Sequence, residues 1–283
     1  MNKTILVGID FSDCSINALE HAVTIAEKAQ ADVVMIWVNR PDSGKEIFRV
    51  DQEHIVSEVI NRFNKLVETH KPTLSKNTIS YLVKAGKVYQ EIVNTAEELD
   101  AFLIIVGTHG SSGFEEFWIG SNANRIVAAT ERPIITIRSV VDAGRTISNI
   151  VMPIDSTVET RQKVPITSLI AKYFDAKIHI LVMKTTTIEE VRQRVDDYVQ
   201  QVERYLFENQ IEFVKKIIET HQIADSTIEY AISINANLIS IMDEQERMPS
   251  NLWLGTFAQQ MVNHSPIPVL CVHVRDLIAD LSR

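Results

Sequence analysis

Glycine is scarce in this chain and unevenly placed. Nine of the 283 residues are glycine, about half of the roughly 7% that is usual in globular proteins. Four of these nine lie in the short segment that begins at Gly107 and ends at Gly120. Because glycine adopts positive φ angles and lets a backbone come close to other groups without strain, this segment is predicted to have a special backbone role.

Cysteine, long apolar runs and positive charge are scarce as well. Cys14 and Cys271 are the only cysteines, which argues against a disulfide framework or a cysteine-based metal site. No apolar run approaches the roughly 18–20 residues of a membrane span, and the five residues Ile5–Ile9 are too short for a signal peptide. The net charge of −9 argues against nucleic acid and anionic membranes as partners. We therefore expect a soluble protein in a reducing, cytoplasmic setting.

Strand-like and helix-like patterns alternate along the first half of the chain. β-Branched apolar runs predict strands at 5–9, 33–38, 79–83, 102–106 and 134–137. Amphipathic spacing predicts helices at 12–30, around 55–66, at 88–99 and at 121–130. This alternation is typical of an α/β fold with a doubly wound, open parallel sheet and right-handed crossovers.

The second half of the chain repeats the first. Leu6–Asp10 matches Val151–Asp155 at an offset of 145 residues, and Ala101–Val106 matches Ala236–Ile241 at an offset of 135. A repeat of this length indicates a duplicated domain, so we predict two domains, 1–142 (the first copy) and 143–283 (the second copy). The change in offset makes the second copy ten residues shorter, between its second and fourth strands.

The glycine segment of the first copy has the composition of a phosphate site. A predicted strand ends in Gly107, Gly110 follows after two residues, and Gly120-Ser121 opens a helix after nine more. Backbone amides freed by glycine can converge on an anion, and the amino end of a helix carries partial positive charge. Ser121 can cap that helix. The alternative is a tight turn that only connects strand to helix. The spacing is neither the Walker pattern nor the dinucleotide-binding G-x-G-x-x-G.

With Asp10 at the end of the first strand, the spacing Gly107-x2-Gly110-x9-Gly120-Ser121 resembles the nucleotide-binding pattern of the universal stress protein family. Within that family the spacing marks the ATP-binding branch. The resemblance spans both copies and is complete in the first. It implies an adenine nucleotide alpha-hydrolase-like architecture in each domain.

The resemblance also implies a nucleotide site. Val38 would offer backbone groups to adenine, and Asp10 would lie near the ribose. A Mg²⁺ ion bridging Asp10 and the phosphates is consistent with the few protein carboxylates that magnesium uses. The alternative is that Asp10 caps the following helix or solvates a loop. The residues expected to contact ATP are Asp10, Phe11, Ser12, Val38, Val106, Gly107, His109, Gly110, Gly120, Ser121 and Asn122.

In this family the last strands of two domains pair across a dimer. Here 134–137 and 269–274 could pair within one chain and form an intrachain pseudo-dimer. A further homodimer and an unknown protein partner remain open.

The second copy departs from the nucleotide-binding pattern. Met242 and Gln245 stand at the positions that match Gly107 and Gly110, and only Gly255-Thr256 survives. A methionine would replace glycine where the backbone has to approach phosphate, and residues 243, 244 and 246 are acidic. We predict that the second copy binds ATP weakly or not at all; the alternative is a rearranged loop that still holds a nucleotide.

Three functions fit this pattern. The first is a regulatory ATP-binding module of the stress response. The second is a slow ATP hydrolase or nucleotidyl-transferring enzyme, but no general base with a phosphate-reaching lysine lies beside the glycine segment, and no catalytic residue is assigned. The third is a stress scaffold that uses no nucleotide. The sequence favours the first.

Overall fold

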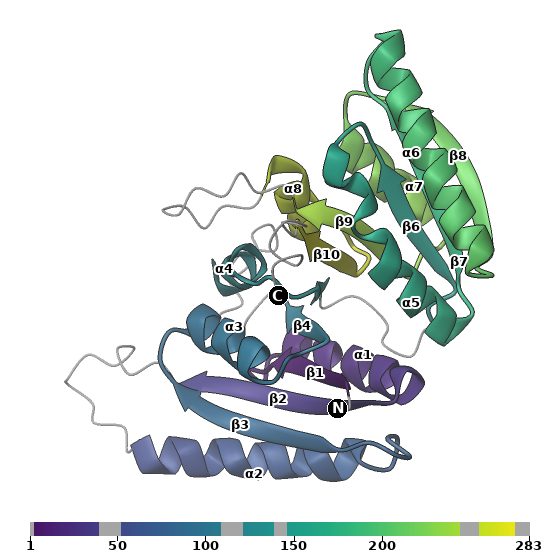
Figure 1. The fold of residues 1–283 in the computed structure, drawn as a ribbon. Helices are drawn as coiled ribbons and strands as arrows, with labels where there is room; N and C mark the ends of the chain where they lie inside the picture. The colour runs from purple at the N-terminus through teal and green to yellow at the C-terminus, as the bar shows by residue number, and fades with distance from the viewer. Residues whose placement is uncertain (1–2, 40–51, 109–120, 139–145, 244–254, 275–283) are drawn as a thin grey trace, which may run out of the picture.

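The computed structural model describes residues 3–39, 52–108, 121–138, 146–243 and 255–274 (Figure 1). The first copy consists of β1 (Lys3–Gly8), α1 (Asp13–Ala29), β2 (Ala31–Asn39), α2 (Gln52–His70), β3 (Ile79–Ala85), α3 (Val88–Glu98), β4 (Leu103–Gly107), α4 (Ser121–Ala129) and β5 (Ile134–Ile137). The second copy consists of β6 (Asn149–Ile154), the 3-10 helix η2 (Val158–Arg161), α5 (Val164–Phe174), β7 (Lys177–Lys184), α6 (Glu189–Glu208), β8 (Phe213–Glu219), α7 (Ile223–Ser233), β9 (Leu238–Asp243), α8 (Thr256–His264) and β10 (Val269–His273).

All ten of these strands join one continuous sheet. Their order is β3-β2-β1-β4-β5-β10-β9-β6-β7-β8. Every neighbouring pair is parallel except β5 and β10, which run antiparallel with Leu270 opposite Ile135. The predicted pairing of the last strands within one chain is thereby confirmed, and the two copies meet at this junction (Figure 1).

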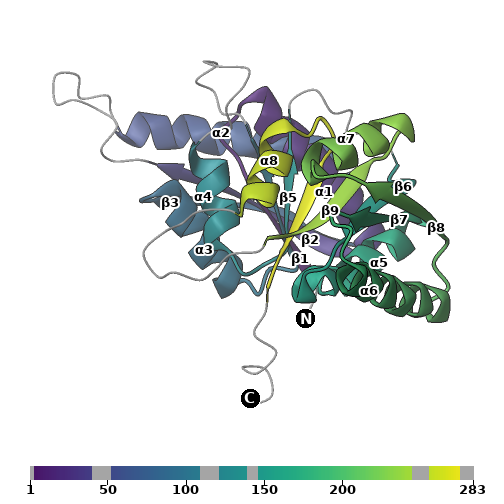
Figure 2. The same cartoon turned by 90° about the horizontal axis from the view of Figure 1, so that it is seen from above.

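Helices cover both sides of the twisted sheet (Figure 2). Successive residues of a strand face opposite sides, so Ile5 and Val7 lie in one apolar cluster with α1, α2, α5 and α6, whereas Leu6 lies in a second cluster with α3, α4, α7 and α8. Both clusters contain residues of both copies. The predicted doubly wound α/β architecture is confirmed.

The first helix of each copy starts differently and ends in the same way. Ser12 caps α1 by accepting a hydrogen bond from the amide of Ser15 at 3.3 Å, as predicted. Gln30 ends α1 in the left-handed conformation, and Asp175, 145 residues later, ends α5 in the same conformation. At its start, however, the second copy has the separate 3-10 turn η2 instead of a continuous first helical turn.

The length difference between the copies lies between their second and third strands. Twelve residues, 40–51, separate β2 from α2, whereas four, 185–188, separate β7 from α6. The offset between the third strands, β3 and β8, is already 134 residues. The length difference was predicted between the second and fourth strands, and these two findings place it between the second and third.

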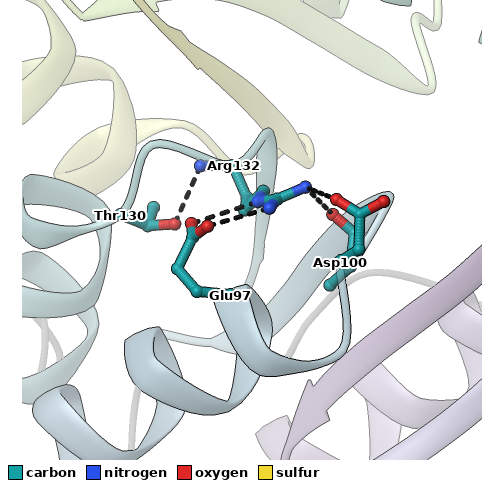
Figure 3. Close-up of polar contacts among 5 residues, drawn as sticks. Glu97, Asp100, Thr130 and Arg132 are labelled. Carbon is teal, nitrogen blue, oxygen red and sulfur yellow. Dashed lines mark hydrogen bonds and ion pairs between the residues drawn. The ribbon is translucent and has the colours of Figure 1, made fainter. Parts of the chain in front are cut away.

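Arg132 ties the end of α3 to the turn before β5 (Figure 3). Its Nη2 and Nε lie 2.8 and 3.1 Å from the carboxylate oxygens of Glu97, and its Nη1 lies 2.5 Å from Oδ1 of Asp100. The amide of Arg132 also donates to Oγ1 of Thr130 at 3.0 Å. The hydrogen bonds to Glu97, followed by those to Asp100, raise the pKa of the guanidinium above its usual range. This cluster lies at the amino ends of β4 and β5.

Arg132→Ala should lower the free energy of unfolding by about 1–2 kcal/mol, because it removes a two-pronged and charge-assisted contact of an arginine side chain that is only 21% exposed. Arg132→Lys should recover only part of this loss, since an ammonium cannot reproduce the forked geometry. Urea unfolding measures both. The control is Lys215→Ala, which removes a single ion pair between a half-exposed lysine and Glu203; it should cost about 0.5 kcal/mol or less. If the two alanine variants lose the same free energy of unfolding, the Arg132 cluster stabilises the protein no more than a single ion pair does.

Candidate functional site

The strand order reverses between β1 and β4. β1 pairs with β2 on one side and with β4 on the other, so that Gly8 is in register with both Ile36 and Val106. In open parallel sheets ligands bind beyond the carboxyl ends of the strands at such a reversal. Asp10 follows β1 and Gly107 ends β4, so the fold brings these two predicted site residues to the same edge.

Asp10 organises the turn that leads into α1. It is exposed, and its Oδ1 accepts hydrogen bonds from the amide of Ser12 at 3.0 Å and from the hydroxyl of Ser12 at 2.5 Å. Asp10 therefore supports the capping residue and is not itself the cap. The second copy repeats the arrangement, with Asp155 accepting from the amide and hydroxyl of Thr157 at 2.9 and 2.6 Å. Because both copies contain this turn, it is not specific to the copy with the complete glycine pattern.

Phe11 uses its side chain for packing. Its backbone has a φ of 61°, and its ring lies 5.1 Å from that of Phe63 and under the guanidinium of Arg62 at 5.4 Å. Phe63, completely buried on α2, stacks in turn on Tyr81 at 4.8 Å. This leaves the backbone of Phe11, more than its ring, for the predicted contact with a nucleotide.

Gly107 has a packing role that the sequence did not reveal. A Cβ atom at this position would lie 2.9 Å from both the carbonyl carbon and the Sγ of Cys14 in the first turn of α1. Cys14 is buried, and its thiol donates to the carbonyl of Ile137 at 3.1 Å. Thr108 donates to the same carbonyl through its amide at 2.9 Å and its hydroxyl at 3.3 Å. Close contact between β4 and α1 therefore requires glycine here, whether or not a phosphate binds.

The other predicted site residues divide into three groups. Val38 and Val106 are buried at the ends of β2 and β4, with side chains in the apolar core. Ser121 and Asn122 are the first residues of α4, so the helix begins at Ser121 itself. The first turn of α4 contains no acidic residue. His109, Gly110 and Gly120 lie outside the described residues.

The second copy is built differently at the matching positions. Met242, which corresponds to Gly107, is buried in the apolar cluster that contains α5. Its side chain thus occupies the core rather than a phosphate loop. Because a side chain at Gly107 would collide with the first turn of α1, a methionine at this place requires that turn to move. The matching segment of the second copy is η2, which ends before α5 begins.

Metal and membrane features are absent from the part of the chain that the structure describes. Within those residues no group of three or more His, Cys, Asp and Glu side chains could hold a metal ion. The same residues include no helix with the length and apolar character needed to cross a membrane.

The sequence profile of the universal stress protein family matches the chain twice, at residues 1–138 and 148–273. Universal stress protein YxiE of Bacillus subtilis (strain 168) is 30% identical over 149 residues, which cover 49% of this chain and 100% of that protein. Universal stress protein A homolog 1 of Coxiella burnetii is 29% identical over 143 residues, covering 48% of this chain and 95% of its own. These relatives therefore have the size of one copy.

A solved structure resembles the whole chain. The universal stress protein from Archaeoglobus fulgidus superposes with a TM-score of 0.74 at 17% sequence identity, covering 95% of this chain and 98% of that chain. A functionally unknown protein from Pseudomonas aeruginosa PAO1 superposes with a TM-score of 0.68 at 15% identity and covers 99% of this chain and 95% of its own. At these identities the likeness concerns the fold, and it includes both copies.

Proposed function

Because this chain belongs to the universal stress protein family, we propose that it is a regulatory module of the stress response that binds ATP in its first copy. Residues 143–283 form a second domain that serves as a built-in structural partner of residues 1–142. Nucleotide occupancy of the first copy changes the contacts that the protein makes with a partner. Neither cysteine forms a disulfide and both are buried, which fits the reducing cytoplasm.

The contrast between the two copies at the helix that follows the fourth strand carries this proposal. In the first copy the residue after Gly107 is Thr108, whose hydroxyl donates to a strand carbonyl, and the first turn of α4 has no acidic residue. In the second copy the residue after Met242 is Asp243, whose carboxylate accepts a hydrogen bond from the amide of Gly255 at the start of α8. An anion is stabilised at a helix amino end, and among the residues that the structure describes the chain supplies its own anion at α8 and none at α4.

The nucleotide would be held by the residues at the edge of β1 and β4. Backbone groups of Phe11, Val38 and Val106 face adenine and ribose, with Asp10 and Ser12 beside the sugar. Amides of the glycine segment and the start of α4 hold the phosphates, through Gly107, His109, Gly110, Gly120, Ser121 and Asn122. The exposed carboxylate of Asp10 and the phosphates suit a hydrated Mg²⁺ ion, which takes few protein ligands. The fraction of chains with bound ATP would report the energy state of the cell.

Nucleotide content of the purified protein tests this proposal. Protein is incubated with ATP and Mg²⁺, freed of unbound nucleotide and denatured, and the released nucleotide is identified by chromatography. We expect close to one adenine nucleotide per chain, because one copy has the complete pattern. Two per chain would contradict the assignment of the second copy as nucleotide-free, and none after incubation with excess ATP would contradict the proposal as a whole.

A further inference from the structure

A buried carboxylate lies at the start of α8. Asp243 is the last residue of β9, and its side chain is fully shielded from solvent. Its Oδ1 accepts a hydrogen bond from the amide of Gly255 at 3.1 Å. Its Oδ2 has no hydrogen-bond partner among the residues described and lies 3.4 Å from Nδ1 of His273, the residue opposite it on β10.

A carboxylate in such a place needs compensation, because burying an unpaired charge is costly. Here the amino end of α8 faces Oδ1, and the imidazole of His273 lies beside Oδ2. Gly255 is the N-cap residue of α8 and has no side chain with which to cap it. The free amides at a helix amino end carry partial positive charge and attract an anion. Asp243 therefore lies where α8 would otherwise bind an anion from solution.

The first copy has no carboxylate at the position that matches Asp243. At the offset of 135 residues, Asp243 matches Thr108 and Gly255 matches Gly120, the last glycine of the phosphate segment. Thr108 turns its hydroxyl to the carbonyl of Ile137 at 3.3 Å. The amino end of α4 thus receives no carboxylate from the strand before it.

We propose that Asp243 is the built-in anion of the second copy, and that its carboxylate takes the place at the start of α8 that a phosphate group takes at the start of α4. Only the comparison with α4 rests on the proposed function; the contacts of Asp243 do not. The consequence is a second copy that holds its last helix in position without a nucleotide and repels any phosphate that approaches α8.

A buried thiol lies close enough to Asp243 to respond to it. Cys271, also on β10, is completely buried, and burial together with the negative charge of Asp243 raises the pKa of its thiol well above the usual range. The thiol thus stays neutral and adds no second negative charge beside the carboxylate.

Asp243→Ala tests this role by leaving a space of carboxylate size next to the amide of Gly255. We expect the equilibrium constant for unfolding in urea to rise about tenfold or more, because a charged acceptor is lost. Sodium formate should restore at least about half of the lost stability compared with sodium chloride at equal ionic strength, because formate binds the folded state at the vacated site. The control is Ile241→Val, a buried change on the same face of β9, for which formate and chloride should act alike. Equal responses of the two variants to formate would overturn the proposal.

Asp243→Asn provides a second measurement if the alanine variant does not fold. The amide side chain fills the same space without charge, so formate should not rescue it. Amide hydrogens in the first turn of α8 should exchange about tenfold faster than in the Ile241→Val variant, since the charge that holds them is gone. Unchanged exchange would contradict the proposal. Nucleotide content should stay at the wild-type value, so that this test can fail independently of ATP binding in the first copy.

Discussion

Gly107→Ala should unfold at a much lower urea concentration than the wild-type protein and should retain little nucleotide. The added Cβ would lie 2.9 Å from the carbonyl carbon and the Sγ of Cys14. The main chain of α1 cannot rotate away as a flexible side chain can, so the first turn of α1 must shift. Overpacking of this kind costs about 3 kcal/mol. The shift also displaces Ser12, which begins the same helix. Urea unfolding and extracted nucleotide measure the two effects.

Gly8→Ala is the matched control for this variant. Gly8 ends the neighbouring strand β1, but a Cβ there would meet the side-chain atoms Cδ1 of Ile92 and Cγ1 of Val106 at 3.3 Å. Such atoms can move by a few tenths of an ångström, so this substitution should cost about 1 kcal/mol or less. If Gly107→Ala is as stable as Gly8→Ala, the close contact between β4 and α1 is not what requires glycine.

Gly110→Asp should abolish nucleotide binding while leaving the fold intact. The change places a side chain and a negative charge into the predicted phosphate segment, where repulsion between like charges should weaken ATP binding at least about 100-fold. Calorimetric titration with ATP and Mg²⁺ measures the affinity. Unfolding in urea without nucleotide should match the wild type, because a glycine has no side chain whose contacts the substitution could remove.

The matched control for Gly110→Asp lies in the second copy. Gln245 corresponds to Gly110 at the offset of 135 residues, and Gln245→Asp should leave affinity and stoichiometry unchanged. Loss of binding in both variants would indicate that the two copies hold nucleotide together. Retained binding in Gly110→Asp would remove the glycine segment from the phosphate site.

The sequence predicted features that depend on local pattern. Ser12 stands before an amphipathic run, and it caps α1 as expected. The repeat, the doubly wound parallel sheet of each copy and the pairing of β5 with β10 followed from the alternation of strands and helices and from the family resemblance. These features are encoded by residues near one another in the chain or by the repetition itself.

The sequence could not predict contacts between residues far apart. The glycine at 107 signalled a close approach, but only the fold shows that the approaching group is Cys14, more than ninety residues earlier. The 3-10 turn η2 contacts β9, the strand on which Met242 is buried, and this contact also needed the folded chain. In the sequence Asp243 is one of several neighbouring acidic residues. Only the folded structure shows that it contacts Gly255, twelve residues later. Ser121 was expected as a cap and is the first helical residue, which is within the usual variation of helix ends.

The antiparallel seam between β5 and β10 is formed within one molecule. Two separate single-copy chains would have to meet in solution to make it, and dilution would pull them apart. Here a covalent tether keeps the partners at a high effective concentration however little protein a cell contains. Identical subunits must also share every change, whereas the halves of a tethered pair can differ: one half has Met242 at the position where the other has Gly107.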